Sequence, residues 1–191
     1  MRTESVFPGI SFAVLNGGKS RRMGKDKGGI RYKGASWLSR AVALLSQYQP
    51  VPLVSVHDIR EVPGGKPVTD LIPGIGPAGG IYSLLKYVDT PKLLVIPVDM
   101  PFLTAGCLDA LLSGCPDDSY LCTFSCEGHP CMLPGIYDKR LLPEMERMIA
   151  GGDYSLRSLF HREVTYRIID GSNFRGELRN INTPEQWDGL R

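Results

Sequence analysis

The chain has 191 residues, 22 of them basic and 20 acidic, and a formal net charge of +2. This length is enough for one domain, which buries about 70% of the surface of its unfolded chain. The balanced charge gives no reason to expect nucleic acid or a membrane as the partner. No apolar run reaches the ~20 residues of a membrane span, and the N-terminus lacks the apolar stretch of a secretory signal. We therefore expect a cytoplasmic protein.

Five apolar runs of strand length recur along the chain, with helix-like segments between them. We expect strands at residues 10–16, 51–57, 92–98, 119–124 and 164–170. The first and third runs are apolar almost throughout, as are central strands covered on both faces. The alternation predicts an α/β fold with a mostly parallel sheet between layers of helices.

Four segments between these runs have the pattern of helices. They are residues 36–47, 77–88, 104–114 and 137–149. Ser36 and Thr104 are predicted N-caps, and Pro77 suits a first helical turn. The remaining stretches at 58–67, 71–76 and 125–130 are expected to be loops.

The five cysteines are odd in number and include no C-x-x-C pair. They stand at positions 107, 115, 122, 126 and 131. This spacing is typical neither of a disulfide framework nor of a structural zinc site. Because free cysteine packs as a small hydrophobe, we expect buried, reduced thiols.

The loop after the first expected strand is crowded with glycine and positive charge. Gly17 and Gly18 follow the strand directly, and residues without a Cβ permit positive φ and close approach of a ligand. Successive N–H groups in such a turn can form an anion-binding nest. Five cations then fall within nine residues: Lys19, Arg21, Arg22, Lys25 and Lys27. The loop lacks the Walker A and G-x-G-x-x-G patterns, so the alternatives are a different phosphate site and a solvated basic loop.

Two acids follow later strand regions. Asp99 ends the buried run in "VIPVDMPFL", where a carboxylate needs a metal or cation as partner. Magnesium is held by one or two protein carboxylates together with substrate phosphates, so one aspartate is sufficient. Asp70 in "VTDLIPGIGPAGGI" precedes a turn and a helix whose first N–H groups could accept an anion. A loop acid and a plain turn with a helix cap are the alternatives.

"LNGGKSRRMGKDKGG" resembles the signature L-A-G-G-x-x-x-R-M-G-x-D-K of nucleotidyltransferases with a sugar-nucleotide-pyrophosphorylase type of fold. Within that superfamily the chain is most similar to the molybdenum cofactor guanylyltransferases. Asp99 matches their D-x-P-F motif, Asp70 opens their D-x-x-x-x-x-G-P-L-A-G segment, and "HP" and "NINTP" match two later motifs. The matches extend from residue 12 to residue 187 in the family's order. The chain departs from the family at Asn16, Ala78 and Ser55, where alanine, leucine and asparagine are usual.

The resemblance implies a set of site residues. Lys27, Arg22 and Asp99 would be catalytic, and Asp99 would hold Mg²⁺. The expected nucleotide contacts are Leu15, Asn16, Gly17, Gly18, Lys19, Lys27, Ser55, Asp70, Gly76, Pro77, Gly79 and Asp99. The expected acceptor contacts are His129, Pro130, Arg157, Asn180 and Asn182. His57 or Asp58 could take over the contact of the family asparagine that Ser55 replaces.

The implied reaction is attack by the terminal phosphate of Mo-molybdopterin on the α-phosphorus of GTP, with release of pyrophosphate. One nucleotidyltransferase domain would comprise a Rossmann-like nucleotide-binding half, about 8–103, and an acceptor-binding half, about 104–191. Its partners would be GTP, Mo-molybdopterin and, transiently, cofactor biosynthesis proteins and recipient apoenzymes. The alternatives are a molybdopterin cytidylyltransferase, a sugar-phosphate nucleotidyltransferase and a non-catalytic carrier of GTP and molybdopterin.

Overall fold

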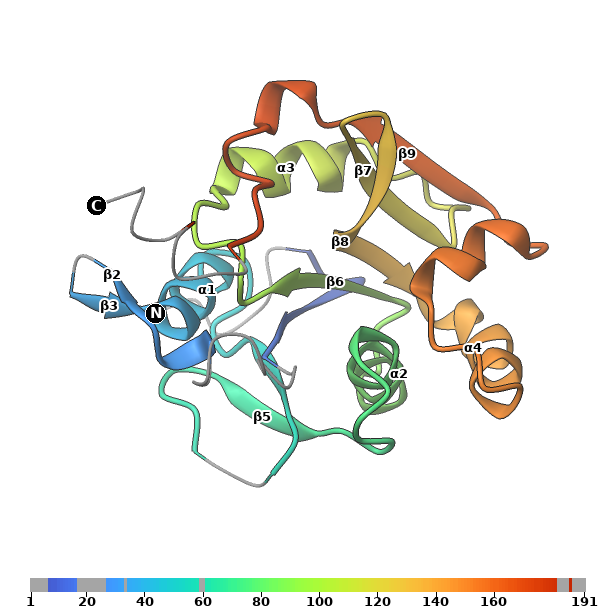
Figure 1. Ribbon diagram of the computed structural model, residues 1–191, viewed down its shortest axis with the longest axis horizontal. Coiled ribbons are helices and arrows are strands. Elements are labelled where there is room, and N and C mark those ends of the chain that lie inside the picture. Colours follow the sequence, from blue (N-terminus) through green and yellow to red (C-terminus); the bar gives the residue numbers. More distant parts are fainter. Residues whose placement is uncertain (1–6, 17–26, 33, 59–60, 182–185, 187–191) are drawn as a thin grey trace.

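The computed structural model of the chain describes residues 7–16, 27–32, 34–58, 61–181 and 186, with only the backbone at 27 and 32. A central sheet lies between helices on its two sides (Figure 1). In the described residues, seven strands form this sheet in the order β5-β4-β1-β6-β8-β7-β9, and β2 and β3 form a separate hairpin.

The strands of the large sheet are β1 (Ile10–Leu15), β4 (Leu53–Val56), β5 (Lys66–Thr69), β6 (Lys92–Pro97), β7 (Leu121–Cys126), β8 (His129–Asp138) and β9 (Tyr166–Asp170). The small hairpin consists of β2 (Arg31–Tyr32) and β3 (Ala35–Ser36). The α-helices are α1 (Trp37–Leu45), α2 (Pro77–Tyr87), α3 (Ala105–Ser113) and α4 (Leu142–Ala150). Short 3-10 helices occupy Lys27–Gly29, Lys139–Leu141, Leu156–His161 and Ser172–Phe174.

The sheet is parallel except at β8. Strand β1 pairs in parallel with both β4 and β6, and β4 pairs in parallel with β5. Strand β8 runs antiparallel to β6 and β7, so β7 and its parallel neighbour β9 have the direction of β6. The expected α/β fold with a mostly parallel sheet is confirmed, and all five expected strands are present.

The core has one layer on each face of the sheet. Phe12 and Val14 of β1 pack in the layer that α1 and α3 cover, whereas Ala13 and Leu15 pack in the layer under α2 and α4. This alternation is what a central strand buried on both faces requires. Figure 1 shows α1 and α3 on one side of the sheet and α2 and α4 on the other. No helix in the described ranges is both long and apolar enough to span a membrane.

The predicted helix starts agree with the structure for the first three helices. The Ser36 hydroxyl accepts a hydrogen bond from the Ser39 N–H at 3.0 Å, and Thr104 accepts one from the Cys107 N–H at 3.2 Å. Pro77 stands in the first turn of α2. The Ser36 and Thr104 signals are strong because each hydroxyl pairs with an N–H group that the helix leaves unpaired. The Pro77 signal is strong because proline has no N–H group that could be left unpaired.

Two strands and one helix boundary differ from the expectations. Strand β5 was not predicted, and its first two residues fall in the predicted loop at 58–67, because Val68 is its only buried residue and the hydrophobic pattern is weak. Strand β8 occupies part of the predicted loop at 125–130 and the first two residues of the predicted helix 137–149. Its two prolines and Gly135 obscure its strand pattern. Helix α4 therefore begins only at Leu142.

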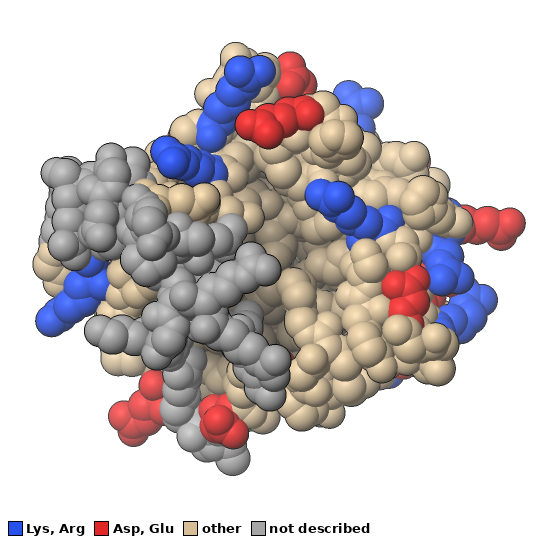
Figure 2. Space-filling view, viewed as in Figure 1, with Lys and Arg blue, Asp and Glu red and all other residues tan. Residues whose placement is uncertain are grey.

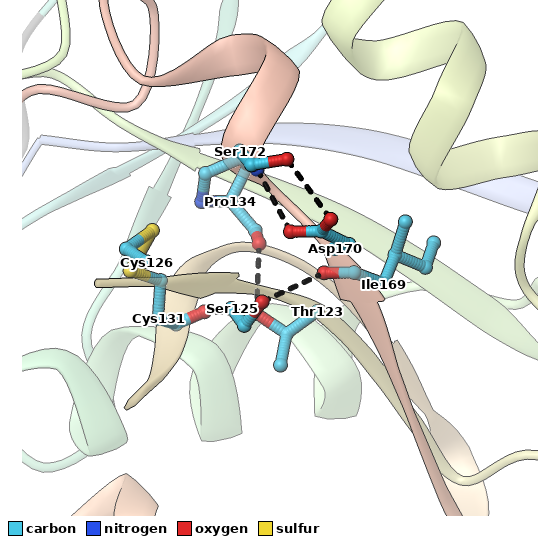
Figure 3. Close-up of a disulfide and its surroundings, with 8 residues drawn as sticks. All are labelled: Thr123, Ser125, Cys126, Cys131, Pro134, Ile169, Asp170 and Ser172. Atoms are coloured by element: carbon cyan, nitrogen blue, oxygen red, sulfur yellow. Dashed lines mark hydrogen bonds between the residues drawn. A yellow bond between two sulfur atoms is a disulfide. The ribbon is translucent and has the colours of Figure 1, made fainter. Parts of the chain in front are cut away.

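The prediction of five reduced thiols is wrong for two cysteines. Cys126 and Cys131 form a disulfide across the β7–β8 hairpin, while Cys107, Cys115 and Cys122 are free. Figure 3 shows the disulfide beside hydrogen bonds that tie β7 to the strands on both sides of it. Ser125 donates from Oγ to the Ile169 carbonyl of β9 at 3.5 Å. The five-residue separation gave no sign of this pairing, because strand β8 itself was not predicted.

Candidate active site at the carboxyl edge of the sheet

The strand order reverses between β1 and β6. Strands β4 and β5 lie on one side of β1, and β6 starts the series on the other side. Leu15 pairs with Ser55 of β4 and with Pro97 of β6, so the three strands end at the same level. A crevice at such a reversal, outside the carboxyl ends of parallel strands, is where α/β sheets bind ligands. Asn16, His57 and Asp99 all follow these strand ends.

Asn16 directly follows β1 and is 5% exposed. Among the described residues, neither its Oδ1 nor its Nδ2 has a hydrogen-bond partner. Most buried polar side-chain atoms in folded proteins have a partner, and leaving one unpaired costs about 1–3 kcal/mol. The Asn16 amide therefore marks a place at the crevice where a ligand or an ordered water completes the hydrogen bonding.

Asp70 is the centre of a buried polar network. Its side chain is 4% exposed, and its Oδ1 accepts a hydrogen bond from Ser55 Oγ at 2.6 Å. Its Oδ2 lies 3.1 Å from Nδ1 of His57, a residue that is itself exposed. Because both Asp70 oxygens are engaged, this carboxylate orients Ser55 and His57, and the exposed imidazole is the part of the network that a ligand can reach.

Helix α2 begins directly against these strand ends. A Cβ on Gly80 would lie 2.4 Å from Leu15 Cδ1 and 2.8 Å from Ser55 Oγ, and one on Gly79 would lie 2.6 Å from the Ile72 carbonyl oxygen. Only residues without side chains permit this approach. Gly76, the N-cap, has a φ of +70°, which also favours glycine. The first N–H groups of α2 are thereby held at the crevice, where they suit an anion or a polar base edge.

Asp99 lies two residues beyond β6 and is partly exposed. Its backbone carbonyl accepts a hydrogen bond from the Ile181 N–H at 2.9 Å. The adjacent N-cap Thr104 donates to Glu177 Oε1 at 2.5 Å, so two contacts hold the 177–181 segment beside the strand end. The exposed Asn180, 81 positions after Asp99, directly precedes Ile181 in this segment.

The structure also brings the β7–β8 hairpin to this edge. His129 and Pro130 begin β8 opposite the carboxyl end of β7, and the β8 residues before Gly135 extend beyond the pairing with β6. Arg157 lies in the 3-10 helix Leu156–His161, and its side chain is exposed. No hydrogen bond or ion pair within the described ranges joins Arg157 to His129 or Asn180.

Several predicted site residues lie outside the described residues. These are Gly17, Gly18, Lys19, Arg22 and Asn182, together with the side chain of Lys27.

The face viewed in Figure 2 is hollowed near its centre, with Lys and Arg side chains of described residues at the rim. Gly80 was not among the predicted site residues, although the double glycine in "GPAGG" was the signal for it.

Comparison with known proteins decides the family. The family model described as the MobA-like NTP transferase domain matches residues 12–166. The chain belongs to this family. This chain is 34% identical to the molybdenum cofactor guanylyltransferase of Xanthomonas euvesicatoria, over 93% of this chain and 92% of that protein.

Solved structures share the fold. Molybdopterin-guanine dinucleotide biosynthesis protein A from Archaeoglobus fulgidus superposes with a TM-score of 0.78 at 22% identity, covering 94% of this chain and 95% of that one. The 2-C-methyl-D-erythritol 4-phosphate cytidylyltransferase from Thermus thermophilus gives a TM-score of 0.64 at 15% identity, covering 91% and 93%. At these identities the likeness concerns the fold, which is that of the nucleotidyltransferases expected from the motifs.

Replacing Gly80 by alanine tests the close contact of α2 with the strand ends. The new methyl group would overlap Leu15 and Ser55, so the free energy of unfolding should fall by about 1–3 kcal/mol. The matched control is Gly176→Ala, whose methyl group meets open space and should change stability by less than about 0.5 kcal/mol. Urea denaturation of both variants checks this, and equal effects would contradict the contact.

Proposed function

We infer that this chain transfers GMP from GTP to the terminal phosphate of Mo-molybdopterin, releasing pyrophosphate. The observation that carries the inference is the arrangement of motifs in a member of the MobA-like family: Leu15 and Asn16, the described residues of "LNGG", lie with "GPAGG" and "VDMPF" at one strand-order reversal. The 34% identity to a molybdenum cofactor guanylyltransferase over nearly the whole length of both chains supports the choice of substrates.

On the nucleotide side, we assign the base and ribose to the surface between Asn16 and the start of α2. Leu15, Asn16 and Gly17 would offer backbone groups, and the N–H groups that follow Gly76 and Pro77 would offer further donors. Asp70 would act by orienting Ser55 and His57, so the exposed His57 would make the contact predicted for Ser55. Lys19, Arg22 and Lys27 would hold the β- and γ-phosphates.

Magnesium fits the residues present at Asp99. In the described part of the chain no three His, Cys, Asp or Glu residues form a metal cluster, so a closed protein cage is not the kind of site offered. One partly exposed carboxylate at the crevice suits a cation that takes its other ligands from phosphates and water. When bound there, Mg²⁺ would neutralise charge on the α-phosphate.

The acceptor would enter from the side of the β7–β8 hairpin. His129 and Pro130 extend from this hairpin at the carboxyl edge, and Asn180 precedes Ile181, whose N–H donates to the Asp99 carbonyl. Asn182 would continue the same segment. Arg157 would bind the acceptor phosphate, since a guanidinium can hold phosphate in a bidentate way.

The chemistry requires positioning more than activation of a protein nucleophile. An anionic oxygen of the acceptor phosphate forms the new bond to the α-phosphorus, and the bond to the β-phosphate oxygen breaks as pyrophosphate leaves. The nucleophile is already ionised, so no serine or cysteine has to be deprotonated. The protein residues would align the two phosphates and balance the charge that accumulates on the leaving group.

The nucleotide preference can be measured with GTP, CTP, ATP and UTP in parallel, each with Mo-molybdopterin and Mg²⁺. We expect pyrophosphate release with GTP in clear preference to the others. Selective use of CTP would instead establish the cytidylyltransferase alternative, which the polar Asn16 at the family's alanine position makes worth testing. Binding of GTP without magnesium-dependent release would establish a carrier.

Asp99→Ala tests the metal assignment. Loss of the only carboxylate proposed to hold Mg²⁺ should reduce turnover by about 10³-fold or more, as expected for loss of preorganised charge stabilisation. The variant retains the contact to Ile181, because that contact is through the Asp99 backbone. Asp89→Ala, at an exposed loop aspartate, is the control and should retain activity. Near wild-type turnover of Asp99→Ala in saturating magnesium would show that the assignment is wrong.

Asn16→Ala tests whether the unpartnered amide serves the nucleotide. We expect KM for GTP to rise about five- to thirtyfold, which corresponds to about 1–2 kcal/mol of lost hydrogen bonding. The free energy of unfolding without nucleotide should not fall, because the amide has no hydrogen-bond partner within the described ranges to lose.

The matched control for Asn16→Ala is Tyr48→Phe. It removes a buried hydroxyl that does have partners, Ala105 O at 3.0 Å and Asp109 Oδ1 at 2.7 Å. This control should lose about 1 kcal/mol of stability without a change in KM. An Asn16→Ala variant that lost stability and kept its KM would identify Asn16 as a structural residue.

A further inference from the structure

A cavity of about 720 Å³ lies at the edge of the sheet opposite Asp99. Lys92, the first residue of β6, lines it, whereas Asp99 follows the last residue of the same strand. The whole length of β6 therefore separates the cavity from the candidate active site. Its volume is within the range of small-molecule sites in proteins. One part of its wall is apolar and consists of Phe7, Ile10, Pro91 and Leu112.

The Lys92 ammonium group is buried at this cavity without a carboxylate partner. Lys92 is only 9% exposed, and its Nζ donates a hydrogen bond to the Pro116 carbonyl at 2.9 Å and lies 3.9 Å from Cys115 Sγ. Within the described ranges this Nζ makes no other hydrogen bond and no ion pair. An ammonium group has three N–H donors, and a buried charge is costly unless an opposite charge accompanies it. Lys92 is therefore equipped to hold an anion in the cavity.

The carboxylate that stands closest to Lys92 in the sheet is used by another cation. Asp138 of β8 is in register with Lys92 of β6 and is 3% exposed. Its Oδ1 accepts hydrogen bonds from the backbone N–H and the Nε of Arg140, and its Oδ2 accepts one from Nη2, each at 2.8 Å. Arg140 thus neutralises Asp138, which leaves the Lys92 charge uncompensated.

The other charged residues of the wall limit the charge of the ligand. Lys139 donates from Nζ to the Val88 carbonyl at 2.6 Å, and Asp117 is exposed. With Asp138 and Arg140 paired, two lysines face one aspartate, so the wall has an excess of one positive charge. A single negative charge fits this balance, whereas a second one would be repelled by Asp117.

We propose that the cavity binds a small carboxylate with an apolar body. The carboxylate accepts a hydrogen bond from Lys92 Nζ, and the apolar body packs against the side chains of Phe7, Ile10, Pro91 and Leu112. A charge-assisted hydrogen bond inside a cavity supplies selectivity for the anion, and burial of apolar surface supplies affinity. This site does not depend on nucleotidyl transfer or on which nucleotide the protein uses.

Calorimetric titration of the full-length protein with 2-naphthoate tests the site, and 2-naphthalenemethanol is the uncharged probe of similar shape. We expect one 2-naphthoate per chain and at least about tenfold weaker binding of the alcohol, as for loss of a hydrogen bond to a charged group. Lys92→Met should weaken 2-naphthoate binding by a similar factor. The matched control is Lys66→Met, at the exposed first residue of β5, which should bind 2-naphthoate as the wild type does. Equal affinity for acid and alcohol, or unchanged affinity in Lys92→Met, would overturn the proposal.

Cys115 provides a second test that needs no substitution and therefore serves if Lys92→Met does not fold. This thiol is free, partly exposed and part of the cavity wall. Saturating 2-naphthoate should slow its alkylation by iodoacetamide, as measured by peptide mass spectrometry, and the protection should persist when GTP and Mg²⁺ are added. Binding of 2-naphthoate without protection of Cys115, or loss of protection on addition of GTP, would place the probe elsewhere and overturn the proposal.

Discussion

The parallel pairing of β1 with both β4 and β6 is the constraint on which the candidate site depends. Because Leu15 is in register with Ser55 and Pro97, three strands end at one level. The residues that follow them, separated by more than 80 positions in the chain, therefore lie together at one edge of the sheet. Helix α2 can begin against the same strand ends only because Gly79 and Gly80 have no side chains. The nucleotide surface is thus a product of sheet topology and close backbone packing.

Polar groups at this edge have two different roles. Asp70 is buried with both oxygens engaged, so it stabilises the geometry of Ser55 and His57. Asn16 is equally buried, but its amide has no hydrogen-bond partner in the described part of the chain, so this unsatisfied amide is a feature that stability alone would not retain. Asp70 therefore has a structural role at this edge of the sheet, whereas Asn16 has an amide that can bind a ligand there.

Much of this arrangement could be predicted from local sequence patterns. The apolar runs of β1 and β6 and the caps Ser36 and Thr104 express strong local preferences, and the motifs placed Asp70 and Asp99 at strand ends. Other features depend on tertiary contacts that no short window of sequence contains. Strand β5 is an edge strand with one buried residue, and β8 carries two prolines. Neither strand therefore shows a clear alternation of apolar and polar residues. The Cys126–Cys131 disulfide and the engagement of Asp70 by His57 follow from such contacts as well.

A crystal structure of the full-length chain with GTP and Mg²⁺ tests the central claim most directly, namely that the nucleotide binds where the strand order reverses. The account predicts the α-phosphate and the metal at Asp99, and the base between Asn16 and the first turn of α2. Nucleotide bound elsewhere, for example in the cavity beside Lys92 and Cys115, or Mg²⁺ bound without Asp99, would contradict it.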